Sequence, residues 1–149
     1  MRSSTDSAIV IDASLAVQPL VNLPASSIVQ GLLRDWLQAG RRLLAPSLLI
    51  PEVLSTLRRY VRAGYLAATG ADRAVEDLFS LHIECVSPDV ALCQSALRWA
   101  ARLDQVRAYD ALYVALAERE GAELWSADER LVRALQGAGG VRAFSVRSG

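Results

Sequence analysis

Residues 8–12 read AIVID, a short run of β-branched residues that ends on an acid. Such a run predicts a buried strand, because parallel strands covered on both faces are apolar along most of their length. Four further short apolar runs predict strands at 42–45, 83–87, 122–126 and 141–146. Apolar spacing and helix-end residues predict helices between the strands, at 26–39, 47–62, 70–80, 88–103, 108–120 and 127–136.

Strands that alternate with helices predict an α/β fold, a three-layer α/β/α sandwich around a five-stranded parallel sheet. The chain of 149 residues is long enough to bury a substantial core. It contains no repeat, low-complexity tract or long linker, so residues 1–149 are expected to form a single domain. Ser47 is expected to cap the helix that follows it, and Gly64 and Gly121 to end two helices.

The composition limits the cellular location and the binding partners that can be expected for the protein. Hydrophobic residues make up 52% of the chain, which suggests that another chain covers part of the surface. No apolar run is long enough to span a membrane and residues 1–7 are polar, so a cytoplasmic location without a membrane partner is expected. All 16 basic residues are arginine, yet the formal net charge is zero. Cys85 and Cys93 match no zinc or redox spacing and are expected to be buried apolar residues.

Acidic residues occur where ligands bind in such a sheet, beyond the carboxyl ends of its strands. Asp12 ends the first strand and Glu52 follows the second. Asp128 follows the fourth strand, and Asp110 lies near the start of the helix that leads into it. If the fourth strand is parallel to the first, that helix begins at the same edge of the sheet. The four acids then converge on one rim.

Each acid also has a purely structural explanation. Asp12 could cap a helix, and for this residue the two explanations carry about equal weight. Glu52 and Asp128, each taken alone, are better explained as first-turn acids that complement the positive end of a helix. Asp110 differs, because its helix, YDALYVALAE, is apolar on nearly every side. A carboxylate on a buried face needs a partner, although Asp110 could also cap its own helix.

Taken together, the four acids place several negative charges on one rim, and no basic residue nearby in sequence is expected to pair with them. Such a cluster is costly unless a cation neutralises it. Carboxylates without histidine or cysteine favour a hard ion, Mg²⁺ or Mn²⁺. The chemistry that follows is metal-assisted hydrolysis of a phosphodiester bond, with one ion or two.

Four segments, taken in order, resemble the PIN domain, and in particular the VapC-like toxins of type II toxin–antitoxin pairs. The segments are IVIDAS with Asp12 and Ser14, APSLLIPEVLSTLRR with Glu52, YDALYVALAE with Asp110, and SADERL with Asp128. Together they span residue 8 to about residue 134. The resemblance implies a metal-dependent endoribonuclease that leaves a 5′-phosphate and a 3′-hydroxyl. It also implies a homodimer and a small antitoxin protein whose C-terminal segment enters the active-site groove.

The same resemblance implies roles for individual residues. Asp12, Glu52 and Asp110 would be the core metal ligands, and Asp128 an outer or second-metal ligand, so that these acids are the expected catalytic residues. Ser126, or Ser14, would hydrogen-bond in the site. Ser126 stands where the family often has threonine.

Two points stay open at the level of the sequence. Arg59 lies seven positions after Glu52, on nearly the same helix face and about 10 Å further along, where it could contact a flanking phosphate. A solvated or ion-paired arginine is the simpler explanation. The second point is the function itself, because a PIN-fold module that binds RNA or a protein and cuts little or not at all would carry the same fold. The residues alone do not separate RNA from DNA, and the resemblance favours RNA.

Overall fold

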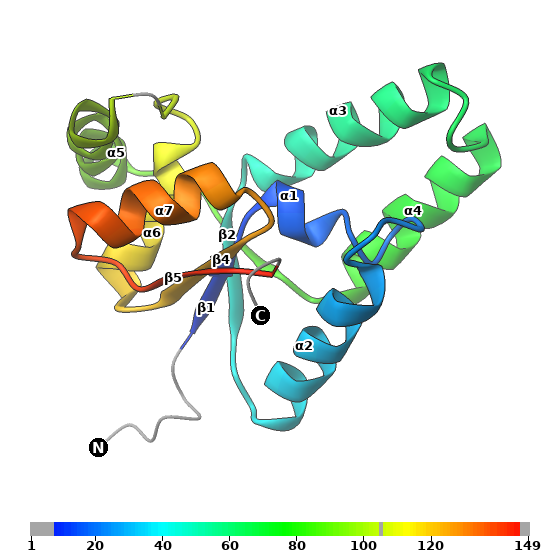
Figure 1. Ribbon diagram of the computed structural model, residues 1–149, viewed down its shortest axis with the longest axis horizontal. Coiled ribbons are helices and arrows are strands. Elements are labelled where there is room, and N and C mark those ends of the chain that lie inside the picture. The colour runs from blue at the N-terminus through cyan, green and yellow to red at the C-terminus, as the bar shows by residue number, and fades with distance from the viewer. Residues whose placement is uncertain (1–7, 105, 147–149) are drawn as a thin grey trace.

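The computed structural model describes residues 8–104 and 106–146, and these residues form one parallel β-sheet with helices on both of its faces (Figure 1). The strands are β1 (Ile9–Ile11), β2 (Leu43–Pro46), β3 (Glu84–Val86), β4 (Glu123–Ser126) and β5 (Ala143–Ser145). They lie in the order β3-β2-β1-β4-β5, and each neighbouring pair is parallel. The predicted α/β fold with a five-stranded parallel sheet is confirmed.

The helices of the described residues are α1 (Ala13–Ala16), α2 (Ser26–Gln38), α3 (Leu49–Arg62), α4 (Ala68–Ser80), α5 (Val90–Leu103), α6 (Ala111–Glu120) and α7 (Glu129–Ala138). In Figure 1, α5, α6 and α7 lie on one side of the sheet, and α1 to α4 lie on the other. The chain passes from α5 to α6 before it enters β4. This is the predicted crossing that lets α6 begin at the carboxyl edge of the sheet. No helix within residues 8–104 and 106–146 is long and apolar enough to cross a bilayer.

The core is built on β1 and α6. Ile9, Val10 and Ile11 are fully buried, because β1 is the central strand and has helices on both faces. Helix α6 packs against β1, β2 and β4, and the five residues 113–117 are all buried. The apolar sequence of α6 therefore corresponds to a helix enclosed between the sheet and α5. α6 ends at Gly121, whose left-handed backbone explains the glycine predicted to stop it.

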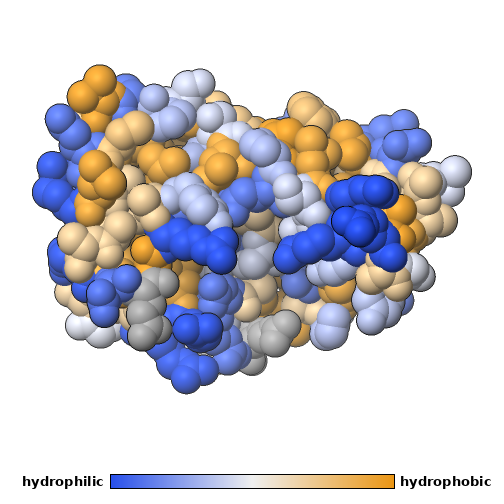
Figure 2. Space-filling model, turned by 90° about the horizontal axis from the view of Figure 1, so that it is seen from above, coloured by the Kyte–Doolittle hydropathy of each residue, from blue (hydrophilic) through white to orange (hydrophobic). Residues whose placement is uncertain are grey.

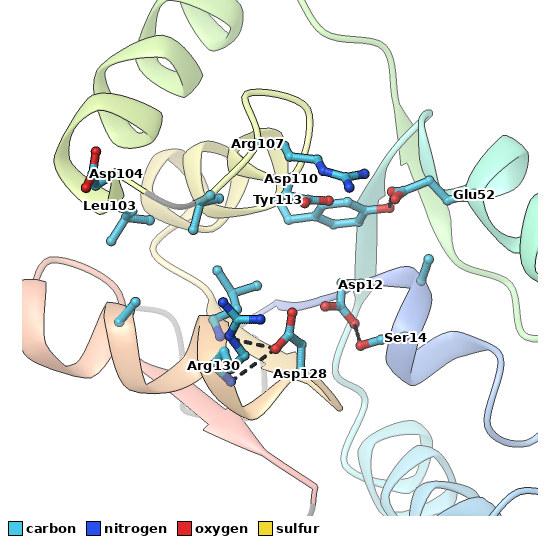
Figure 3. A pocket seen from close by; sticks show the side chains of 14 residues that line it. Asp12, Ser14, Glu52, Leu103, Asp104, Arg107, Asp110, Tyr113, Asp128 and Arg130 are labelled. Carbon is cyan, nitrogen blue, oxygen red and sulfur yellow. Dashed lines mark hydrogen bonds between the residues drawn. The ribbon is translucent and has the colours of Figure 1, made fainter.

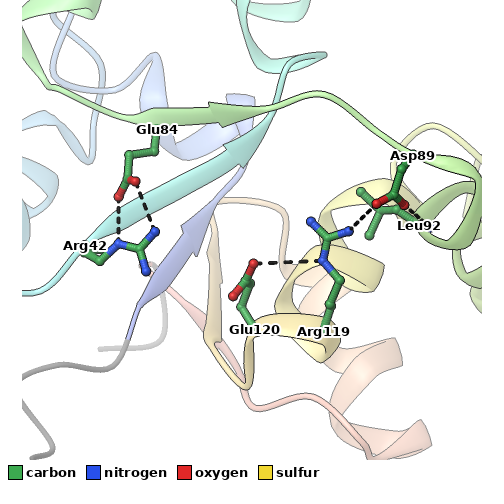
Figure 4. A network of polar contacts seen from close by, with 6 residues as sticks. All are labelled: Arg42, Glu84, Asp89, Leu92, Arg119 and Glu120. Carbon is green, nitrogen blue, oxygen red and sulfur yellow. Dashed lines mark hydrogen bonds and ion pairs between the residues drawn. The ribbon is translucent and has the colours of Figure 1, made fainter. Parts of the chain in front are cut away.

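Arginine–carboxylate pairs tie the elements together at the amino ends of the strands. The guanidinium of Arg42, just before β2, donates two hydrogen bonds of 2.9 and 3.0 Å to Glu84, the first residue of β3 (Figure 4). Arg41 pairs at 2.6 Å with Glu123, the first residue of β4. Arg119 at the end of α6 reaches Asp89, the N-cap of α5, at 3.2 Å. The acids at this edge of the sheet thus have cationic partners.

Three local predictions are wrong: the cap of α3, the burial of the two cysteines and the number of helices. Ser47 does not cap α3, since the helix begins at Leu49 after an N-cap residue, Leu48, that makes no side-chain hydrogen bond. Cys85 and Cys93 are exposed rather than buried, because β3 is an edge strand and Cys93 lies on the outer face of α5. The four-residue helix α1 has no counterpart among the predicted helices.

Candidate active site at the carboxyl edge of the sheet

The four predicted acids line one cavity of about 690 Å³ at the carboxyl edge of the sheet (Figure 3). Asp12 follows β1 directly, and Asp128 follows β4 by two residues. Glu52 lies in the first turn of α3, and Asp110 stands at the N-cap position of α6. The convergence expected from a parallel sheet is therefore observed.

Asp12 is the most constrained of the four acids. Its Oδ1 accepts from the Ser14 hydroxyl at 2.7 Å and from the Leu15 backbone N–H at 3.0 Å. Its Oδ2 accepts from the Ser126 hydroxyl at 2.5 Å. Asp12 is thus the N-cap of α1, which confirms its structural explanation, and it also lines the cavity.

Burial raises the pKa of Asp12 to about 6, because desolvation disfavours its charged form. The hydrogen bonds from Ser126, Ser14 and Leu15 oppose this shift, and the nearby negative charge of Asp128 adds to it. The metal-free carboxylate of Asp12 is therefore held at an energetic cost at neutral pH. A cation beside it would remove that cost.

The two serines join β1 to β4 behind the acid. Their hydroxyl oxygens lie 3.2 Å apart, and Ser14 Oγ also accepts from the Ala127 N–H at 3.0 Å. Ser126 Oγ accepts from the Asp128 N–H at 2.9 Å. Ser126 is fully buried, so its hydroxyl positions Asp12 and does not face a ligand. Ser14 is half-buried and lines the cavity, which leaves it within reach of one.

Glu52 is held by a residue to which the sequence assigned no role. The Tyr113 hydroxyl donates to Glu52 Oε1 at 2.5 Å, although the two residues lie 61 positions apart. Tyr113 is only 2% exposed, and its pKa lies far above the usual range because of burial and the hydrogen bond to Glu52, so the hydroxyl keeps its proton. The sequence signal was present, since Tyr113 is one helical turn after Asp110 in an apolar helix.

The pKa of Glu52 is raised, mainly by burial and further by the charges of Asp110 and Asp12. The Tyr113 hydroxyl works against this by stabilising the carboxylate. Negative charges from three different elements therefore act on one another across the cavity.

Asp110 and Asp128 differ in what holds them. Asp110 makes no side-chain capping bond, so the alternative that it caps its own helix is wrong. Burial raises the pKa of Asp110, Arg107 lowers it, and the charge of Asp128 raises it. Asp128 does cap α7, accepting from the Arg130 and Leu131 N–H groups at 3.0 and 3.3 Å. The predicted first-turn acid is therefore the N-cap residue itself, one position before the first turn, and it also lines the cavity.

The donor atoms fit a hard divalent cation, because every candidate ligand in the cavity is a carboxylate or a hydroxyl. Asp12, Glu52 and Asp110 form no ion pair with any residue in the described ranges. Within those ranges, no three histidine, cysteine, aspartate or glutamate residues are arranged closely enough to hold an ion as they stand. Side-chain rotation would have to bring the carboxylates together around a cation.

Arg59 does not line this cavity. It lines a second cavity of about 870 Å³ that adjoins the first and shares five of its residues: Ala13, Ser14, Glu52, Arg107 and Asp128. Arg107 and Arg130 contribute positive charge to the acidic cavity, and Asp104 contributes a fifth acid. The expectation that the acids have no basic neighbour in sequence is therefore wrong, because Arg107 lies three residues before Asp110 and lowers its pKa. The sequence had assigned no role to Arg130 or Asp104.

Comparison with known proteins agrees with this arrangement. The profile of the PIN domain family matches residues 9–135. Ribonuclease VapC3 of Mycobacterium tuberculosis is 36% identical over 128 residues, which cover 85% of this chain and 86% of that protein. The chain therefore belongs to the PIN domain family, as its motifs indicated. Within this family, it is related to the VapC ribonucleases.

Solved structures share the fold at lower identity. PAE2754 from Pyrobaculum aerophilum has a TM-score of 0.67 and 20% identity, and the match covers 95% of this chain and 85% of that one. VapC20 of Mycobacterium tuberculosis, a toxin that cleaves the sarcin–ricin loop, has a TM-score of 0.66 and 18% identity, with 91% and 99% covered. VapBC2 from Rickettsia felis, bound to a promoter DNA fragment, has a TM-score of 0.62 and 12% identity, with 92% and 97% covered.

The raised pKa of Asp12 predicts how stability depends on pH. The folded chain keeps the Asp12 proton up to about pH 6, whereas the unfolded chain releases it near the ordinary value of 3.8. The stability that this protonation contributes is thus full below pH 3.8 and lost as the pH rises through about 6. In EDTA, Asp12→Asn should gain stability relative to the parent by roughly 3 kcal/mol between pH 3.5 and pH 7.

Urea unfolding of both proteins at the two pH values measures this difference. Asp35→Asn, on the exposed face of α2, is the matched control and should track the parent. A parent and an Asp12→Asn variant with the same pH dependence would contradict the assignment.

Proposed function

We propose that this chain is a Mg²⁺- or Mn²⁺-dependent endoribonuclease and the toxin of a toxin–antitoxin pair, acting as one domain over residues 1–149. The observation that carries the proposal is the cavity at the carboxyl edge of the sheet, which is lined by the four carboxylates of Asp12, Glu52, Asp110 and Asp128. Sequence similarity to the VapC ribonucleases supports RNA as the substrate.

Asp12, Glu52 and Asp110 would hold the cation, with Asp128 as an outer ligand or a ligand to a second ion. A divalent ion in this position supplies Lewis-acid chemistry, because it lowers the pKa of a bound water and offsets charge on phosphate oxygens. Mutual repulsion of the acids supports this assignment. The pKa of Glu52 is raised in part by Asp110 and Asp12, and the pKa of Asp110 in part by Asp128.

The chain's own residues position the reacting groups. Ser14, Ser126 and the Leu15 N–H fix both oxygens of Asp12, and Tyr113 fixes one oxygen of Glu52. Asp110 lacks a capping bond, so its carboxylate is available to accept a hydrogen bond from an attacking water. Among the described residues that line the cavity there is no cysteine, lysine or histidine, and the one serine, Ser14, already donates to Asp12. Water is therefore the nucleophile, and the products would be a 5′-phosphate and a 3′-hydroxyl.

Asp110→Asn should lower metal-dependent RNA cleavage by at least about a hundredfold while the fold is retained, since the change removes one charge without changing the side-chain volume. Cleavage of a mixed RNA pool with Mg²⁺ or Mn²⁺, and with EDTA, measures this loss. Asp104→Asn is the control, because Asp104 lines the same cavity outside the proposed ligand set. It should stay within a few-fold of the parent.

Cleavage that persists in EDTA or in Asp110→Asn would contradict the proposal. A well-folded parent that binds RNA in the presence of metal but does not cut it would favour the other class of function. The protein would then be a PIN-fold module for binding RNA or a protein.

Tyr113→Phe should weaken Mn²⁺ binding by about tenfold and leave the fold intact, because the hydroxyl that fixes Glu52 is lost and the ring is kept. Calorimetric titration with Mn²⁺ measures the affinity directly. Tyr65→Phe is the control, since Tyr65 is 84% exposed and lies beyond the cavity. An unchanged affinity in Tyr113→Phe would remove Tyr113 from the proposed site.

The proposal includes two protein partners, a cognate antitoxin and a second copy of this chain. The structural likeness to a VapBC2 complex supports the antitoxin. Val90 and Leu97 support the homodimer, because they are 74% and 63% exposed and lie seven residues apart on one face of α5.

Light scattering should give a mass of about twice the 16.1 kDa of one chain, and Leu97→Asp should halve that mass by disrupting the contact between the two copies. A monomeric parent would contradict the homodimer.

A further inference from the structure

The two adjoining cavities form one groove, because Ser14, Glu52, Arg107 and Asp128 are among the residues that line both. Figure 2 looks onto the face from which α3 and α5 project, and hydrophilic side chains flank a hollow near the middle of that face. The proposed cleavage chemistry uses only the first cavity. The second cavity is therefore a candidate for binding the part of a substrate that is not cut.

The two ends of this groove differ in charge. The residues that line the first cavity alone include three acids, Asp12, Asp104 and Asp110, and one arginine, Arg130, so this end carries an excess of negative charge. Of the described residues, those that line the second cavity alone include one arginine, Arg59, and no acid. A polyanion that enters the groove is repelled at the first end unless a cation is bound, and it is attracted at the second.

Arg59 is placed to contact a phosphate. Its Nη2 donates to the Thr56 hydroxyl one helical turn away at 3.2 Å, which orients the guanidinium along α3. Arg59 pairs with no carboxylate among the described residues. Guanidinium donors left without a carboxylate beside a cavity suit an anionic ligand, and phosphate accepts them in a bidentate manner.

Tyr109 is placed to stack on a base. Tyr109 is 40% exposed and lines the second cavity. The Arg107 guanidinium donates to the Tyr109 hydroxyl and lies 5.6 Å from the ring centroid, which holds the ring in place. A partly exposed, buttressed aromatic ring beside an arginine is the arrangement that binds unpaired bases.

The cavity wall also offers an unused acceptor. Gln18 is 7% exposed and lines the second cavity, where its Nε2 donates to the Ser14 carbonyl at 3.3 Å. Its Oε1 is a buried side-chain atom without a hydrogen-bond partner in the described part of the chain. A ribose hydroxyl or a water would supply the missing donor.

We propose that the second cavity binds a nucleotide that flanks the scissile phosphate in single-stranded RNA, with Arg59 on a phosphate and a base stacked on Tyr109. The inference rests on the proposed endoribonuclease function and specifies the substrate, because stacking on Tyr109 requires an unpaired base. Arg59 and Tyr109 are substrate-positioning residues, and neither takes part in hydrolysis.

Binding of a labelled single-stranded RNA by the Asp110→Asn protein with Mg²⁺, which leaves the RNA uncut, tests the two residues separately. Adding Tyr109→Ala should weaken binding by between about fivefold and 150-fold, the range for loss of one stacked base, without changing the salt dependence. Adding Arg59→Ala should reduce the slope of log affinity against log salt by about 0.7, the value for one phosphate contact on a single strand.

The chain offers a matched control for each change. Arg58 precedes Arg59 on α3 but lines a separate apolar cavity with Leu54 and Val61. Tyr65 is more exposed than Tyr109 and does not line the groove. Arg58→Ala and Tyr65→Ala should each leave both the affinity and the salt slope within about twofold of the background.

A set of RNAs with one abasic nucleotide at each position in turn identifies the stacked base. At one position, next to the cleavage site, Tyr109→Ala should no longer lower the RNA affinity, because the base that stacks on Tyr109 is absent from that RNA. A constant penalty at every position would overturn the stacking contact.

Failure of this inference differs from failure of the proposed function. If the parent cuts RNA and all four alanine variants bind it equally, the subsite is overturned and the endoribonuclease stands, which would leave the second cavity to a protein segment. If the parent never cuts but the Tyr109 and Arg59 effects appear, the subsite stands and the nuclease proposal fails. If the parent binds no RNA, both are overturned.

Discussion

The repulsion between carboxylates gathered at one edge of the sheet is the constraint on which the rest of the site depends. At the amino ends of the strands, Glu84 and Glu123 are paired with Arg42 and Arg41. At the carboxyl ends, Asp12, Glu52 and Asp110 have no such partner among the described residues, and burial raises the pKa of each. The fold therefore neutralises the acids at one edge with arginines and leaves the acids at the other edge without an ion-pair partner among the described residues.

The chain tolerates these acids because neutral donors hold them. Two serines and a backbone N–H bind Asp12, and the Tyr113 hydroxyl binds Glu52. These hydrogen bonds fix orientation without cancelling charge, which is what a site for a divalent ion requires. Ser126 lies on β4 and Tyr113 on α6, and both elements pack against the central strand β1, whereas Ser14 and Leu15 lie on the short helix α1. Two of the supporting hydrogen bonds therefore come from elements of the rigid core. Arg107, in the segment before α6, contributes to both ends of the groove.

Much of the fold could be predicted because its signals are local. The run AIVID and the apolar α6 carry their own periodicity, and alternation of strands and helices then implies a parallel sheet with the acids at one edge. The remaining features depend on partners distant in sequence. Ser126 lies 114 positions from Asp12 and Tyr113 lies 61 from Glu52, so no local pattern connects them. Exposure of Cys85 follows from β3 being an edge strand, a property of the strand order rather than of residues 83–87.

Binding of a divalent cation at the acidic edge can be tested by anomalous X-ray diffraction from crystals grown with Mn²⁺. If the proposed site is correct, an anomalous peak will lie in contact with carboxylate oxygens of Asp12, Glu52 and Asp110. These side chains will have rotated toward one another, and Tyr113 will still donate its hydrogen bond to Glu52. Crystals that contain Mn²⁺ at saturating concentration but show no peak in this cavity would contradict the account.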